Sequence, residues 1–271
     1  MDLLNHSFPF SKTALNGKHA LIFGASKGIG AATAKMMAMA GADVTLCARN
    51  SESLKRVKDE IETFATGRIS FRNVDLEELS VIDEIIDEIT TNLGPVHILV
   101  NNSGGPPGGP LLKNSVEDFD APFTRHLHAA HKITQRLVPL MESEGFGRII
   151  QIISTSVKEP IPNLGLSNTL RGAMASWSKS LSRELHPCIT INNVLPGFTD
   201  TERLGNLAES INQKTGKSID EIHDGWMGQV PIERLVDPLE TASAITFLAL
   251  PSSGAIRGVS LAVDGGRLRS I

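Results

Sequence analysis

Three glycines near the amino end of the chain have a spacing that could bind a phosphate. Gly24, Gly28 and Gly30 form the pattern G-x-x-x-G-x-G. An apolar run of strand length, 19–23, precedes them, and a segment rich in the helix formers Ala, Met and Lys, 31–40, follows. A strand, a glycine-rich turn and a helix form the geometry that binds dinucleotides, because the helix N-terminus offers free N–H groups to the pyrophosphate.

Each glycine has a separate task in this interpretation. Gly24 permits the tight turn, Gly28 removes a Cβ where the backbone approaches phosphate, and Gly30 lets the helix pack against the strand. Ser26 and Ile29 lie within the same turn and are candidate cofactor contacts. A glycine-rich turn of an unrelated α/β protein is the alternative for the motif taken by itself.

Two cations indicate which dinucleotide would bind. The run 42–48 is typical of a second strand, and Arg49 follows it. In this geometry an acidic residue at that place would bind the ribose 2′-hydroxyl of NAD, whereas Arg49 can accept a 2′-phosphate. Lys27 is a second cation directed at the same region. Together they predict NADP(H), with solvated surface charge as the alternative for both side chains.

Composition narrows the class of protein. The chain has 271 residues with 41% apolar content and a net charge of −4, which argues against binding to nucleic acid or to an anionic membrane. Residues 1–17 lack the pattern of a secretory signal, and no apolar run reaches the length of a membrane span. Cys47 and Cys188 read as two buried free thiols in a reducing compartment, so we expect a cytoplasmic protein. No metal site is predicted.

Strand-length apolar runs alternate with amphipathic helical segments along the chain. This alternation predicts an α/β fold, a single-domain Rossmann-type doubly wound parallel sheet of about seven strands with helices on both faces. We expect an N-terminal arm at 1–16, a dinucleotide-binding domain at 17–271 and a substrate lid at about 202–229. The expected strands are 19–23, 42–48, 69–74, 96–100, 148–153, a sixth within 189–197, and 259–263; the expected helices are 31–40, 51–65 with Ser51 as its N-cap, 77–93, 117–141, 165–186 and 238–250.

The glycine spacing resembles that of the short-chain dehydrogenase/reductase family, and matching motifs recur over residues 17–267. They include Asn101-Asn102-Ser103-Gly104, the segments 175–185 and 189–197, the turn Pro-Gly-Phe-Thr-Asp-Thr at 196–201 and Asp264-Gly265-Gly266. The overall likeness is to 3-oxoacyl-acyl-carrier-protein reductases. The resemblance implies a small carbonyl or alcohol substrate. It also implies a homo-oligomer formed through 117–141, 165–186 and 259–263.

The resemblance also implies further cofactor contacts. Asp75 would receive the adenine amino group, although a helix N-cap remains open as its role. The turn after the fourth strand would pass beneath the cofactor ribose, and the turn after the sixth would pack on the nicotinamide. The implied contacts are Asp75, Leu76, Asn102, Ser103, Gly104, Arg171, Pro196, Gly197, Thr199 and Thr201.

The catalytic positions depart from the family pattern. Ser154 directly follows the run 148–153 and, by the resemblance, would hydrogen-bond the substrate carbonyl. Thirteen positions later the family has Tyr, and four further on Lys; this chain has Ser167 and Arg171 there, and it contains no tyrosine. Ser167 is too short and too weakly acidic to replace a phenol, and Arg171 stays protonated. His126 stands where the family carries an Asn that holds a relay water, and imidazole titrates near neutral pH.

Three functions follow from this departure. The expected one is an NADP(H)-dependent oxidoreductase that reduces a 3-oxoacyl-like carbonyl with a proton from water held by Ser154 and Ser167, from His126, or from Lys158. The alternative is an NADP(H)-binding pseudoenzyme that acts as a sensor or partner subunit. Non-redox chemistry, as in the halohydrin-dehalogenase relatives, fits less well, because they keep the Tyr and lose the cofactor glycines. For His126 the alternative is a packing role alone, and packing is the favoured role of His128 and His131. Trp226 and Met227 either face the ligand or pack the lid.

Overall fold

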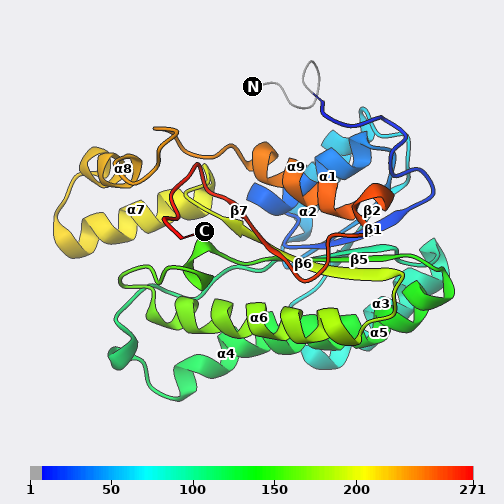
Figure 1. Cartoon of the computed structure of the whole chain (residues 1–271), viewed down its shortest axis with the longest axis horizontal. Coiled ribbons are helices and arrows are strands. Elements are labelled where there is room, and N and C mark those ends of the chain that lie inside the picture. The colour runs from blue at the N-terminus through cyan, green and yellow to red at the C-terminus, as the bar shows by residue number, and fades with distance from the viewer. Residues whose placement is uncertain (1–7, 271) are drawn as a thin grey trace.

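A computed structural model describes residues 8–270, which form one seven-stranded parallel sheet with helices on both faces (Figure 1). The predicted α/β doubly wound fold is therefore confirmed. Residues 1–7 of the expected N-terminal arm lie outside the described residues. In the order β3-β2-β1-β4-β5-β6-β7, the strands are β1 His19–Phe23, β2 Asp43–Ala48, β3 Ile69–Asn73, β4 Ile98–Asn101, β5 Gly147–Ile152, β6 Ile189–Pro196 and β7 Ser260–Val263.

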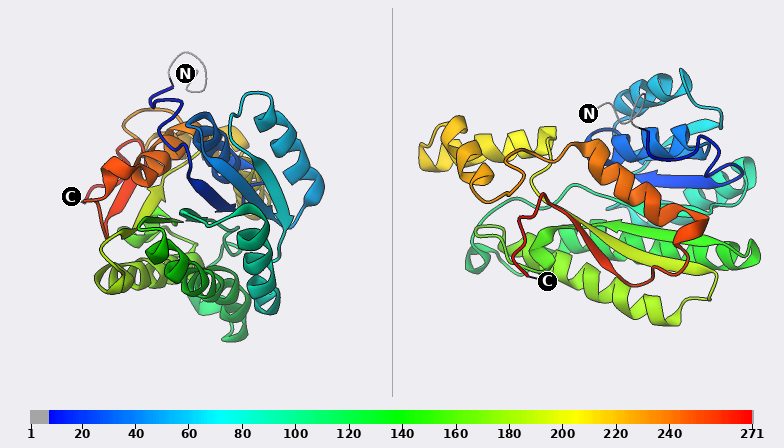
Figure 2. Two further views of the ribbon diagram at one scale, coloured as in Figure 1. Left: turned by 90° about the vertical axis from the view of Figure 1, so that its right-hand side faces the viewer. Right: turned by 45° about the horizontal axis from the view of Figure 1, so that its top comes forward.

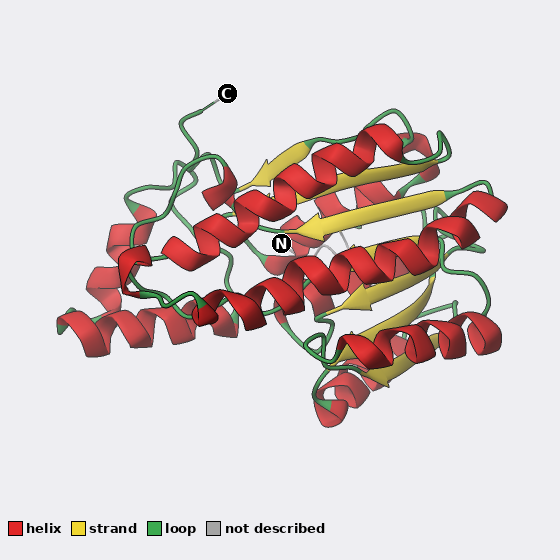
Figure 3. Ribbon diagram, turned by 90° about the horizontal axis from the view of Figure 1, so that it is seen from below, coloured by secondary structure: helices red, strands yellow, loops and turns green. Residues whose placement is uncertain are grey.

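Helices cover the sheet in two layers, with α1, α2 and α9 on one face and α3, α5 and α6 on the other (Figures 1 and 2). Two further helices, α7 and α8, lie beyond the end of the sheet to which the strand arrows point (Figure 3). The helices are α1 Gly28–Met39, α2 Ser51–Glu62, α3 Ile82–Leu93, α4 Asp120–Phe123, α5 Ala129–Ser143, α6 Gly165–Glu184, α7 Glu202–Thr215, α8 Ile219–Met227 and α9 Pro238–Ala249.

The central strands are buried on both faces, which explains their unbroken apolar sequences. Every residue of β1, β4 and β5 is buried. Because side chains alternate along a strand, Ile22 belongs to the core cluster beneath α1 and α9, whereas its neighbour Leu21 belongs to the cluster beneath α3 and α5. The sheet therefore separates two apolar layers.

The direction of strand succession reverses between β1 and β4. The chain proceeds from β1 outward to β2 and β3, then returns to pair β4 on the other side of β1. In open α/β sheets the crevice at the carboxyl ends of the strands, at such a reversal, is where ligands bind. The glycine turn after β1 and the turn after β4 both lie at this crevice.

Several sequence predictions need correction at the level of single residues. Asn50, not Ser51, caps α2, because its Oδ1 accepts the backbone N–H of Ser53 at 2.8 Å. The helix predicted at 117–141 contains a π-helical turn at Thr124–His128 that joins α4 to α5. Cys47 is buried as expected, but Cys188 is only half-buried. Within residues 8–270, no helix is long and apolar enough to cross a bilayer.

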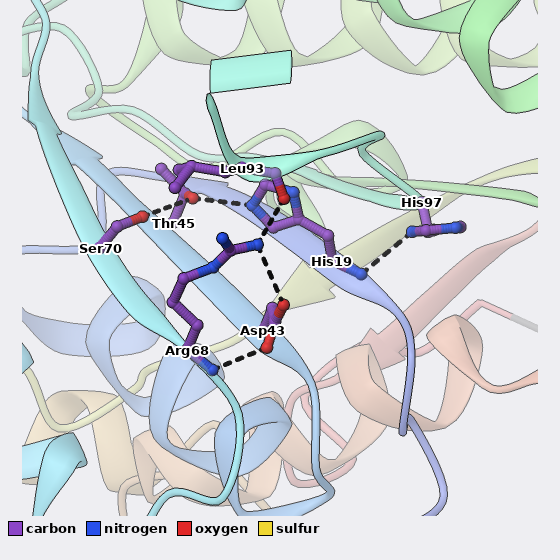
Figure 4. A network of polar contacts seen from close by, with 7 residues as sticks. All are labelled: His19, Asp43, Thr45, Arg68, Ser70, Leu93 and His97. Carbon is purple, nitrogen blue, oxygen red and sulfur yellow. Dashed lines mark hydrogen bonds and ion pairs between the residues drawn. The ribbon is translucent and has the colours of Figure 1, made fainter. Parts of the chain in front are cut away.

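Hydrogen bonds between polar residues join the strands near their amino ends (Figure 4). The backbone N–H of His19 donates to Nδ1 of His97 at 3.1 Å, and Nε2 of His19 lies 2.7 Å from the hydroxyl of Thr45. Asp43 accepts the backbone N–H of Arg68 at 2.7 Å. Burial lowers the pKa of both imidazoles, so they are neutral in the folded protein near neutral pH. This network lies at the end of the sheet opposite the crevice.

Candidate functional site

Two cavities of about 630 Å³ each lie at the carboxyl ends of the strands. The first adjoins the glycine turn and the ends of β2 and β4. The second adjoins the ends of β5 and β6. Helix α7 forms part of both walls, because Glu202 and Arg203 line the first cavity and Leu204 and Leu207 line the second. The two cavities therefore share one wall.

The first cavity gathers residues that the sequence assigned to a cofactor. They are Gly24, Ser26, Lys27, Gly28, Ile29, Arg49, Asp75, Leu76, Asn102, Ser103, Gly104 and Thr201. The other predicted contacts lie elsewhere: Gly30 is buried, Arg171 lines a small void, Thr199 is buried, and Pro196 and Gly197 line the second cavity.

Close contacts explain the glycine spacing. Gly24 and Gly28 have φ values of +62° and +55°, which glycine adopts without strain. A Cβ on Gly30 would lie 2.1 Å from the carbonyl oxygen of Gly24, so only glycine allows α1 to approach the turn. Asn102 donates its side-chain N–H to the same oxygen at 3.3 Å and ties the two turns together.

The N-terminus of α1 is open to a ligand. Its first residue is Gly28, no side chain caps the helix, and its first turn contains no acidic residue. The N–H groups of a first helical turn have no partners within the helix and carry partial positive charge. A phosphate in the first cavity would satisfy them, so the cavity fits the pyrophosphate of a dinucleotide.

The two predicted 2′-phosphate cations have different surroundings. Nζ of Lys27 lies 2.6 Å from Oε1 of Glu202, and both side chains are largely exposed. Arg49 is 64% exposed, and its Nη1 is 4.0 Å from a carboxylate oxygen of Asp75. The guanidinium of Arg49 is therefore the more available of the two for a phosphate.

His126 is buried at the π-helical turn, beneath the turn that follows β4. Its Nδ1 lies 2.6 Å from the hydroxyl of Ser103, and its Nε2 lies 3.0 Å from the carbonyl oxygen of Gly104. Because a carbonyl can only accept, Nε2 carries the proton, and Nδ1 accepts from Ser103. Burial, with a smaller contribution from the Arg171 charge, lowers the pKa of His126 to about 2. A neutral ring with both nitrogens engaged orients the turn and is a poor proton donor.

Arg171 is a buried cation on α6. It is 7% exposed, its Nη1 donates to the carbonyl oxygen of Ile152 at 3.1 Å, and its Nε has no partner. Within residues 8–270 no carboxylate lies at ion-pairing distance from Arg171. Burial and the charges of Arg203 and Arg125 lower its pKa to about 10, so it stays protonated at neutral pH. It lines a void of about 10 Å³ with His126, close to the lower limit for one water molecule.

Ser154 lines the second cavity. Its Oγ accepts the backbone N–H of Ser156 at 3.1 Å, which leaves the hydroxyl hydrogen free to donate to a substrate oxygen. Ser167 is half-buried in the first turn of α6. Among the described residues, the walls of the two large cavities include Ser154 but not Ser167 or Arg171. The structure therefore does not bring the four predicted catalytic residues onto one cavity wall.

The predicted lid is built from α7 and α8. Thr201 caps α7, and its Cγ2 would lie 3.3 Å from a Cβ on Gly28, so the lid begins against the glycine turn. Trp226 stacks on Phe198 with ring centroids 5.3 Å apart and also lines the second cavity. Trp226 thus packs the lid and faces the cavity, whereas Met227 belongs to the apolar cluster of the lid.

Sequence reasoning missed three arginines at the site. Arg125 and Arg203 line the first cavity, and Arg267 lines the second. Arg203 lies two positions after the predicted contact Thr201, and this proximity in the sequence could have indicated it. Arg267 comes from the segment after Asp264-Gly265-Gly266, and no local pattern places it beside β5. Within the described residues, no three His, Cys, Asp or Glu side chains are grouped so as to hold a metal ion.

The sheet, the open helix N-terminus and the two adjoining cavities define a Rossmann-type fold, and the reversal of strand order is where such folds bind their ligands. The chain belongs to the short-chain dehydrogenase family, whose sequence pattern matches residues 18–212. The resemblance found in the sequence is thereby confirmed at the level of the family.

Comparison with known proteins supports this assignment. The chain is 32% identical over 254 residues to an uncharacterized oxidoreductase of Mycobacterium tuberculosis, covering 93% of this chain and 92% of the relative. It is 31% identical to the 3-oxoacyl-[acyl-carrier-protein] reductase FabG of Vibrio cholerae, covering 93% and 98%. The crystal structure of L-sorbose reductase from Gluconobacter frateurii, complexed with NADPH and L-sorbose, superimposes with a TM-score of 0.89 at 26% identity, covering 96% and 100%.

Proposed function

We propose that this protein is an NADP(H)-dependent oxidoreductase that reduces a small carbonyl compound of the 3-oxoacyl type. The observation that carries the proposal is the shared wall of two cavities, one at an uncapped helix N-terminus and one beside Ser154. The complex of L-sorbose reductase with NADPH and L-sorbose supports the same pairing of ligands.

The first cavity would hold the cofactor. The N–H groups at the start of α1 would bind the pyrophosphate, and Arg49 with Lys27 would bind the 2′-phosphate. Arg171 lines the small void next to this cavity and not the cavity wall, so its contact with the nicotinamide ribose stays a prediction of the family resemblance. When bound, NADPH supplies a hydride to the carbonyl carbon, so that with one proton on the oxygen a ketone becomes an alcohol and NADPH becomes NADP⁺.

Ser154 would position the substrate, because its free hydroxyl hydrogen can donate to the carbonyl oxygen as negative charge develops there. The same cavity accepts an apolar substrate body, since Phe198, Leu204 and Trp226 form part of its wall. The thioester and ketone functions of 3-oxoacyl compounds are compatible with these contacts.

The proton would come from water. His126 is neutral with both nitrogens engaged, and Arg171 with a pKa of about 10 holds its proton at neutral pH. Lys158 is exposed and is not among the residues that line the second cavity, and Ser167 is too weakly acidic. Losing a general acid typically lowers a rate by about 10²- to 10⁴-fold rather than abolishing it. The proposal therefore predicts a slow but measurable reductase.

NADPH oxidation with a panel of 3-oxo acids, 3-oxoacyl thioesters, ketones and quinones tests the proposal. We expect turnover of at least one carbonyl compound, and Ser154→Ala should lower kcat by about 10²-fold or more. Tight NADPH binding without oxidation of any compound, together with no effect of Ser154→Ala, would instead favour the NADP(H)-binding pseudoenzyme. The observation that supports this second function is the lack of any tyrosine that could act as the family's proton donor.

A further inference from the structure

The charged side chains that line the second cavity are all positive. Its lining includes two cations, Lys214 and Arg267, and no Asp or Glu among the described residues. The rest of the wall is apolar or uncharged, with Phe198 and Trp226 as its aromatic part. A cavity with low-dielectric walls and charges of one sign attracts ligands of the opposite sign. Its electrostatics therefore favour an anionic substrate.

Arg267 is held in place by side chains of the cavity. Its Nη1 donates to Oγ1 of Thr155 at 3.1 Å, and its guanidinium lies 5.0 Å from the centroid of the Phe198 ring. Its Nε has no partner among the described residues. A guanidinium has five N–H donors in a fixed fork that matches a carboxylate. Arg267 therefore has a fixed position and unused donors.

The carboxylates that hold the C-terminal segment do not neutralise Arg267. Asp264 accepts the backbone N–H groups of Gly266 at 3.0 Å and of Leu268 at 2.8 Å. Glu159 accepts the backbone N–H of Arg269 at 2.8 Å. In residues 8–270 neither carboxylate lies within ion-pairing distance of Arg267. The segment is thus ordered around a cation that lacks an anionic partner.

Arg267 lies close to the group expected to bind the carbonyl. Its partner Thr155 directly follows Ser154 in the chain, and both residues line the cavity. Lys214, by contrast, is exposed on α7, with Nζ 3.5 Å from the carbonyl oxygen of Gly108 at the rim. An anionic group on Arg267 would therefore be separated from a carbonyl on Ser154 by a short spacer.

We propose that the second cavity selects short oxo acids, with the substrate carboxylate on Arg267, the ketone oxygen on Ser154 and the alkyl group against Phe198 and Trp226. This inference rests on the proposed carbonyl reductase activity and names its substrate class. It distinguishes a free acid from a thioester or a neutral ketone.

A matched pair of substrates tests the inference. We expect kcat/KM for 3-oxohexanoate to exceed that for its methyl ester by about 10- to 100-fold, the range that a charged hydrogen bond contributes. Arg267→Gln should remove most of this ratio, and Arg267→Lys should retain part of it. Arg269→Gln, which changes an exposed cation on the same segment, is the control and should keep the wild-type ratio. Equal use of acid and ester by the wild type, or an unchanged ratio in Arg267→Gln, would overturn the inference.

A binding measurement separates this inference from the proposed function. With NADP⁺ present, hexanoate should raise the melting temperature of the wild type more than hexanamide does, and Arg267→Gln should lose the difference while Arg267→Lys keeps part of it. Hexanoate binding without reduction of any carbonyl would contradict the reductase but leave the anion site standing. No difference between hexanoate and hexanamide in the wild type would contradict the anion site itself.

Discussion

Lys27 in the glycine turn and Glu202 at the start of the lid form an ion pair, with Nζ 2.6 Å from Oε1. The pair joins segments that are 175 residues apart in the chain. It also occupies one of the two cations expected to bind the 2′-phosphate. The ion pair links the start of α7 to the glycine turn, and it leaves Arg49 as the more available of the two cations for a phosphate.

Arg49→Ala should remove most of the preference for NADPH over NADH. Arg49 is exposed, and its contact with the carboxylate of Asp75 is long, at 4.0 Å, so a phosphate can engage its guanidinium. Loss of a charged hydrogen bond should weaken NADPH binding by about 10- to 100-fold and leave NADH binding nearly unchanged. Titration calorimetry with both nucleotides measures the ratio, and an unchanged ratio would refute this assignment of Arg49.

Glu202→Gln should strengthen NADPH binding, because Lys27 would no longer be shared with a carboxylate. Exposed ion pairs are weak and screened by solvent, so the expected gain is small, about two- to fivefold. The gain should shrink at high salt, because dissolved ions already weaken the attraction between Lys27 and Glu202 in the wild type. NADPH titrations of the wild type and the variant at low and high ionic strength provide the comparison. Weaker binding by the variant would show that Glu202 supports the cofactor site instead.

Gly30→Ala should destabilise the protein and impair NADPH binding, because its Cβ would lie 2.1 Å from the Gly24 carbonyl oxygen. Overpacking of this kind costs roughly 1–3 kcal/mol. Gly225→Ala is a suitable control, since a Cβ there meets no heavy atom within 4 Å. Urea unfolding and fluorescence titration with NADPH should show a loss for the first variant only.

His126 should make the protein less stable in acid. Its folded pKa of about 2 is below the unfolded value of 6.5, so the unfolded state binds more protons between these values. Stability from this group is therefore complete above about pH 6.5 and falls as the pH decreases, by up to ~1.4 kcal/mol per pH unit. His19 and His97 act in the same direction.

The variant His126→Asn isolates that contribution. Between pH 7.5 and pH 5 its free energy of unfolding should fall less steeply than that of the wild type, even if it is lower throughout. Chemical unfolding at several pH values provides both slopes. Parallel curves for the two proteins would contradict a buried, neutral His126.

We also propose that the chain forms a homo-oligomer. The family resemblance implies contacts through 117–141, 165–186 and 259–263, and the last of these segments includes the edge strand β7. Phe247 of α9 is 43% exposed, and Val259 and Leu261 are 38% and 37% exposed. Large apolar side chains gathered at an edge strand favour contact with a second subunit. Light scattering should show a dimer or tetramer, and Leu261→Lys should shift it toward the monomer. A monomeric wild type would refute the proposal.

Much of the fold was predictable because its determinants are local. Strand β1 begins and ends at the predicted residues, and the other strands differ from prediction by a few residues at their ends. Apolar runs and glycine turns act over a few neighbours, so the sequence pattern alone indicates them. The cap of α2 was wrong by one position, since both Asn50 and Ser51 can cap a helix and only backbone geometry selects one.

The sequence by itself determined the sheet, the phosphate-binding turn and the missing phenol, because these depend on residue type and short spacing. Only the tertiary structure decided that His126 is neutral between Ser103 and Gly104, and that Glu202 pairs with Lys27. It likewise placed Arg267 beside Thr155 and kept Ser167 out of the wall around Ser154. The reason is physical: burial and contact between distant segments arise from the packing of whole helices and strands, and no short stretch of sequence specifies them.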